Sequence, residues 1–145
     1  TAMAAGSYAV LLRASIEYKG ELRTEALHLH SQSSIETDAP LDNQGKAERF
    51  SPSDLVATAL GSCMMTIMGI KARDMQLDLT GVTIDIQKHM LSDPRRIGGV
   101  DVIFHFPEHI QLDEKQKTIL KNAALACPVA KSIHPDIEQR VEFNW

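Results

Sequence analysis

Uncharged side chains, mostly hydrophobic or small, fill one long stretch in the middle of the chain, residues 55–70. The stretch has a helix start signal, because Ser51 can act as N-cap, Pro52 suits the first turn and Asp54 closes a capping box. A helix that is apolar on every face is a buried one, and its Ser, Thr and Gly interruptions favour a core helix over a membrane span. We therefore expect sheets or a second subunit to cover it.

Alternating polar and apolar positions on both sides of this helix predict strands. Before it, we expect strands over residues 8–18, 22–30 and 33–37, and then a loop over 38–49. After it, we expect strands over 82–90 and 100–106 joined by a hairpin connection, helices over 113–126 and 128–133, and a last strand at Val141 and Phe143. Asp113 and Gln116 predict a second capping box at the start of the 113–126 helix. The order βββ-α-ββ-α-β predicts an α+β fold, with antiparallel sheets around a long buried central helix.

The composition predicts one domain over residues 1–145, with 1–7 disordered or outside the native fold. A net charge of −4 and a pI of about 5.8 argue against a nucleic-acid or membrane partner. The chain opens without the pattern of a signal peptide, and its two cysteines do not form a secreted disulfide framework. We expect a cytoplasmic protein.

Cys63 lies inside the central helix, where a free cysteine is most simply a small buried hydrophobic residue. A reactive cysteine needs its thiolate, which an apolar site disfavours. The helix dipole fades within a turn, and Cys63 lies ~18 Å from the helix start. If Cys63 is reactive, a cation brought in through space has to activate it.

Cys127 has a more favourable local setting, because it directly precedes Pro128, a residue suited to the first position of a helix. Unpaired backbone N–H groups at such a position favour an anion. The spacing alone therefore leaves Cys127 as a rival nucleophile, and the alternative is that it merely ends the preceding helix. His28 and His30 share one strand face, but a solvated face is a simpler explanation than a metal site, so we expect no metal.

Two motifs together resemble the OsmC/Ohr family of thiol-dependent hydroperoxide reductases. They are Ser51-Pro52-Ser53-Asp54-Leu55 followed by Ala59-Leu60-Gly61-Ser62-Cys63, and Ala126-Cys127-Pro128-Val129. The resemblance implies an α+β fold, an intertwined homodimer with active sites at the subunit interface, and no cofactor. It also implies that Cys63 is the peroxidatic cysteine, which becomes a sulfenic acid, and that Cys127 is the resolving cysteine. An external dithiol would reopen the disulfide.

The family also uses an arginine near the N-terminus to stabilise the thiolate, and Arg23 is the candidate here. Arg49 is an alternative cation. The chain departs from the family at Ser53, where OsmC and Ohr proper carry the glutamate that holds the arginine. Asp54 or Glu48 could replace it, and the departure places the chain nearer the less characterised OsmC-like branch.

These residues predict a peroxidase that reduces organic hydroperoxides or hydrogen peroxide through a sulfenic acid and an intramolecular disulfide. The alternative is a non-enzymatic dimer that senses redox state or binds a small molecule. Loss of free thiol on adding peroxide would separate the two.

Overall fold

The structure is a computed structural model that describes residues 13–145. Within it the chain divides into two compact units, with the boundary between Pro52 and Ser53. The strand predicted from residue 8 lies partly outside the described residues, as does the disordered start expected at 1–7. A single domain stays a prediction.

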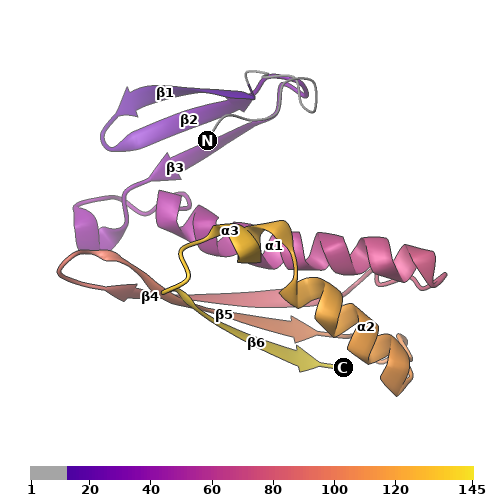
Figure 1. Ribbon diagram of the computed structural model, residues 1–145. Helices are drawn as coiled ribbons and strands as arrows, with labels where there is room; N and C mark the ends of the chain where they lie inside the picture. The colour runs from indigo at the N-terminus through magenta and orange to yellow at the C-terminus, as the bar shows by residue number, and fades with distance from the viewer. Residues whose placement is uncertain (1–12) are drawn as a thin grey trace, which may run out of the picture. The chain divides into compact units, whose positions relative to one another are not determined.

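The first unit is a three-stranded antiparallel sheet in the order β1-β2-β3 (Figure 1). Its strands are β1 (Ala14–Gly20), β2 (Arg23–His28) and β3 (Ser34–Asp38), and a short 3-10 helix, η1 (Leu41–Asn43), follows. Ile16, Tyr18 and Ile35 lie on one face of the sheet and are 70%, 64% and 53% exposed. Among the described residues of this unit, no apolar side chain is buried. The face therefore lacks a cover within its own unit.

The second unit contains the sheet β4-β5-β6 and the three α-helices (Figure 1). Its strands are β4 (Thr83–Leu91), β5 (Arg96–His105) and β6 (Glu138–Asn144). β4 and β5 form the predicted antiparallel hairpin, but β6 runs parallel to β5. The expectation of antiparallel pairing is wrong for this strand, because the helical connection between β5 and β6 is a crossover, which returns the chain in the same direction.

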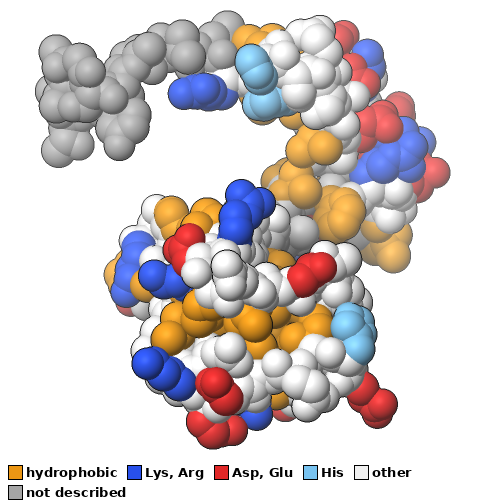
Figure 2. Space-filling model, turned by 90° about the vertical axis from the view of Figure 1, so that its right-hand side faces the viewer, with side chains coloured by type: hydrophobic (Ala, Val, Ile, Leu, Met, Phe, Trp, Pro, Cys, Tyr) orange, Lys and Arg blue, Asp and Glu red, His pale blue; other side chains and the backbone are white. Residues whose placement is uncertain are grey.

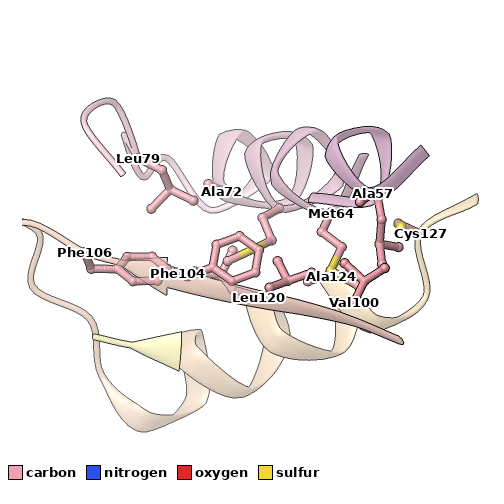
Figure 3. Close-up of a cluster of buried hydrophobic side chains, with 13 residues drawn as sticks. Ala57, Met64, Ala72, Leu79, Val100, Phe104, Phe106, Leu120, Ala124 and Cys127 are labelled. Carbon is pink, nitrogen blue, oxygen red and sulfur yellow. The ribbon is translucent and has the colours of Figure 1, made fainter. Parts of the chain in front are cut away.

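The core of the second unit lies on one face of this sheet. Val100, Val102 and Phe104 alternate along β5 and are at most 1% exposed, while the residues between them face away from the core. Helix α2 (Glu114–Leu125) contributes Leu120 to the cluster, and Figure 3 shows it beside Phe104. The predicted capping box of α2 is confirmed, because Asp113 and Gln116 bond each other's backbone N–H groups.

Helix α1 (Pro52–Asp74) is the predicted central helix, but only one of its faces is covered. Its buried residues recur at helical spacing and form the covered stripe: Ala57, Leu60, Gly61, Met64, Met68 and Ala72. On the opposite face Val56 and Ile70 are 41% and 54% exposed. The length and composition of α1 would also suit a membrane-spanning helix, but core helices commonly have the same length and composition. The covered stripe of α1 identifies it as a core helix. Within the described chain one side of α1 is therefore covered, and cover of the other side by a second subunit stays a prediction.

Candidate functional site

The two cysteines, 64 positions apart in the sequence, come together in the second unit. Cys63 is carried by α1 and is partly exposed, while Cys127 directly precedes the short helix α3 (Pro128–Ser132) and is buried. The Cys63 side chain lies close enough to Cys127 to raise the pKa of its thiol, and neither cysteine is in a disulfide. Two neighbouring free thiols form a pair that can be oxidised to a disulfide.

Cys127 is the N-cap of α3, as the following proline predicted. Its backbone is extended, with φ −65° and ψ 153°, and its Sγ accepts a hydrogen bond from the backbone N–H of Ala130 at 3.3 Å. Gln139 on β6 donates from Nε2 to the Ala130 carbonyl at 3.0 Å, which ties this first turn to the sheet. Burial raises the pKa of the Cys127 thiol, and the Ala130 N–H partly opposes that effect.

The surroundings of Cys127 are the buried core itself. It is 0% exposed and lies at one end of the hydrophobic cluster, on the side of Ala57 and Val100 (Figure 3). Cys63 packs against the same cluster without being enclosed by it. One thiol therefore faces the core and the other is open to the outside of the described unit.

Arg23 belongs to the first unit, at the start of β2, where it forms a two-pronged ion pair with Asp38 on β3. Arg23 Nε donates to Asp38 Oδ1 at 2.7 Å, and Arg23 Nη2 donates to Asp38 Oδ2 at 2.8 Å. The hydrogen bond with Asp38 raises the pKa of Arg23, and the bond with Arg23 holds the pKa of Asp38 below its usual range. The ion pair therefore holds the guanidinium in one orientation and keeps it protonated.

The sequence analysis missed Asp38. Arg23 and Asp38 stand directly opposite each other in the β2–β3 register, so the signal was available once that register was known. Both contribute to a cavity of about 300 Å³ that is also lined by Lys19, Glu36 and Lys46. The carboxylate that holds the arginine in this unit is thus a cross-strand neighbour.

Glu48, a predicted arginine partner, lies next to the same ion pair. Its Oε1 accepts from Arg23 Nη2 at 3.3 Å, and its backbone N–H donates to Asp38 Oδ2 at 3.0 Å. The loop that carries Glu48 depends on Gly45, where an added Cβ would lie 1.7 Å from the Ala39 carbonyl oxygen. The alternative cation Arg49 pairs instead with Glu36, at 3.1 Å.

Asp54, the other predicted partner, lies in the second unit and has a different neighbour. Lys88 on β4 places Nζ 2.9 Å from Asp54 Oδ1 and donates to Ser53 Oγ at 2.9 Å. A role for Asp54 toward Arg23 stays a prediction. His28 and His30 contact each other edge to face, and within residues 13–145 no group of three or more metal-ligating side chains gathers.

The chain is similar to known proteins over most of its length. A family model described as OsmC-like protein matches residues 45–142. A crystal structure from Psychrobacter arcticus, provisionally described as an osmotic stress induced and detoxification response protein, is 51% identical, covers 95% of this chain and 99% of that one, and has a TM-score of 0.89. No curated protein matches the chain significantly.

More distant structures share the fold. An organic hydroperoxide resistance protein OsmC from Legionella pneumophila is 15% identical, with a TM-score of 0.72 over 95% of this chain and 100% of that one. The organic hydroperoxide resistance protein OhrB of Bacillus subtilis is 17% identical, with a TM-score of 0.66 over 92% and 98%. These likenesses confirm the predicted α+β fold.

Proposed function

Since the chain belongs to the OsmC-like family, we propose that it is a cofactor-free, thiol-dependent peroxidase that reduces organic hydroperoxides or hydrogen peroxide. Proteins named for organic hydroperoxide resistance have the same fold, and this supports a function in the response to peroxides. The observation that carries the proposal is the contact between Cys63 and Cys127, one partly exposed and one buried.

The proposed reaction begins at Cys63, the thiol that a substrate can reach. Its thiolate attacks a peroxide oxygen, the O–O bond breaks, and the leaving oxygen takes a proton to become alcohol or water. Cys127 then attacks the sulfenic acid sulfur, the S–O bond breaks with loss of water, and a Cys63–Cys127 disulfide forms. An external dithiol returns both cysteines to thiols and is itself oxidised to a disulfide.

We propose that Arg23 supplies the cation that Cys63 needs. Asp38 binds the Nε and Nη2 edge of the guanidinium and thereby fixes its orientation. The opposite nitrogen, Nη1, carries two further N–H donors, and in this proposal they bind a thiolate and a peroxide oxygen at the same time. A lysine at this position would offer only a point charge.

We further propose that the protein works as a homodimer. Exposed apolar residues lie on the sheet of the first unit and on the open face of α1, and Figure 2 shows hydrophobic side chains at the surface. Ile16, Ile35 and Ile70 are each more than half exposed, and an obligate interface that covered such faces would bury more than ~2,000 Å². A monomer by light scattering at micromolar concentration would contradict this. A cytoplasmic location also stays a proposal.

Single cysteine variants test the reaction. Cys63→Ser should abolish peroxide consumption, while Cys127→Ser should still complete one turnover and leave a sulfenic acid that a dimedone probe traps. The opposite pattern would make Cys127 the nucleophile, as its N-cap position first indicated. If wild-type protein lost free thiol on adding one equivalent of peroxide but did not turn over with any dithiol, the redox-sensing alternative would be favoured.

A further inference from the structure

We infer that the external dithiol attacks the Cys63 sulfur of the Cys63–Cys127 disulfide and that Cys127 departs as the leaving group. This inference rests on the proposed function, because it concerns the disulfide of that reaction. Thiol–disulfide exchange depends on which of the two sulfurs the attacking thiolate can reach. The two cysteines of this chain differ in that respect.

Access favours Cys63. The attacking sulfur has to approach along the extension of the S–S bond, from the side of the sulfur it attacks. Cys127 is 0% exposed at one end of the core cluster (Figure 3), so an attacking thiolate cannot reach its sulfur without displacing core side chains. Cys63 is partly exposed on α1, and it adjoins the face of the helix where Ser62 and Thr66 are exposed.

The surroundings of Cys127 have two opposing effects on how easily its thiolate leaves. Burial raises the pKa of its thiol, which slows a leaving thiolate, while the Ala130 N–H at 3.3 Å stabilises the developing charge. Gln139 holds the Ala130 carbonyl, so the donor stays in place as the S–S bond breaks. Access decides the outcome, because a sulfur closed off by the core cannot be attacked however well its partner leaves.

The proposed step balances as follows. A thiolate of the dithiol forms a bond to Cys63 Sγ, the Cys63–Cys127 bond breaks, and Cys127 leaves with the electron pair and takes up the proton lost by the dithiol. The second thiol of the reductant then attacks the reductant sulfur that is bonded to Cys63, and Cys63 is expelled as a thiolate. The reductant is oxidised to a cyclic disulfide, and the protein is reduced by two electrons.

The test forms the disulfide with diamide rather than peroxide, so it does not depend on peroxidase activity. Oxidised wild-type protein is treated with a monothiol such as 2-mercaptoethanol, quenched with acid, alkylated and mapped by mass spectrometry. We expect the mixed disulfide on Cys63 and the alkyl group on Cys127, in at least ~10-fold excess over the reverse arrangement. The same disulfide unfolded in guanidinium is the matched control, where both sulfurs should react to a similar extent.

A second measurement uses single-cysteine proteins loaded with a chromogenic aromatic thiol. Dithiothreitol should release the chromophore from Cys63 in the Cys127→Ser protein at least ~10-fold faster than from Cys127 in the Cys63→Ser protein. A mixed disulfide mainly on Cys127, equal release rates, or no intramolecular disulfide with diamide would overturn the inference. A protein that reacts at Cys63 here but never consumes peroxide would refute the proposed function alone.

Discussion

The open face of α1 allows the proposed dimer to be tested with one substitution. Ile70 is 54% exposed in the single chain. Full burial of an isoleucine side chain contributes ~1.5–3 kcal/mol, so covering the exposed half contributes roughly 1–1.5 kcal/mol per subunit. In a two-fold dimer each residue counts twice. Ile70→Ala should therefore weaken the dimer by ~2–3 kcal/mol, or roughly 30- to 140-fold in dissociation constant.

Sedimentation velocity over a range of protein concentrations measures this change. Leu60→Ala is the matched control, because Leu60 is 0% exposed and lies on the covered stripe of the same helix. It should lower the free energy of unfolding by ~2–5 kcal/mol through the cavity it leaves. If Ile70→Ala left the dissociation constant unchanged, the open face of α1 would not be the interface and our reasoning from its exposure would be wrong.

Three further predictions concern the first unit. Arg23→Ala should slow peroxide attack on Cys63 at least ~10-fold, measured as the rate of single-turnover peroxide consumption in the Cys127→Ser background, and Arg23→Lys should recover only part of the rate. Because pairing with Arg23 lowers the pKa of Asp38, the ionised carboxylate stabilises the folded unit above about pH 4. This stabilisation is lost as the pH falls further and Asp38 becomes protonated. Amide exchange in β3, corrected for its intrinsic pH dependence, should reveal that opening, and Asp38→Asn should remove it. Gly45→Ala should increase amide exchange in the loop around residue 45, because the added Cβ would clash with the Ala39 carbonyl. Gly69→Ala is the control, because its added Cβ would have no neighbour within 4 Å, and it should leave amide exchange in that loop unchanged.

The order of helices and strands could be predicted from periodicity, because each element buries one side. The alternation of Val100, Val102 and Phe104 predicted β5, and the capping box at Asp113 predicted the start of α2. The ends were less predictable: β5 begins at Arg96, inside the segment expected to be a hairpin connection. The direction of β6 could not be read from its own residues, since a parallel and an antiparallel edge strand show the same alternation.

The candidate site was only partly predictable, and Asp38 shows why. Its sequence position, at the end of a strand and before Pro40, is typical of a loop boundary. Its function as the partner of Arg23 depends on the β2–β3 register, which sets the two residues opposite each other across the sheet. A shift by one residue would have turned the two side chains to opposite faces. The family resemblance indicates an arginine partner near the start of α1, so it pointed to Glu48 and Asp54 and not to Asp38.

The apolar composition of α1 predicted that the helix is buried but did not identify what buries each of its faces. Within the described chain one stripe of the helix is covered by its own unit, and the opposite stripe, with Val56 and Ile70, is exposed. Cys63 is partly exposed beside that open stripe, and Cys127 lies in the covered core. The thiol pair therefore lies where the core of one chain ends and the proposed interface begins. A second subunit would then change the surroundings of Cys63 far more than those of Cys127, which are complete in the single chain.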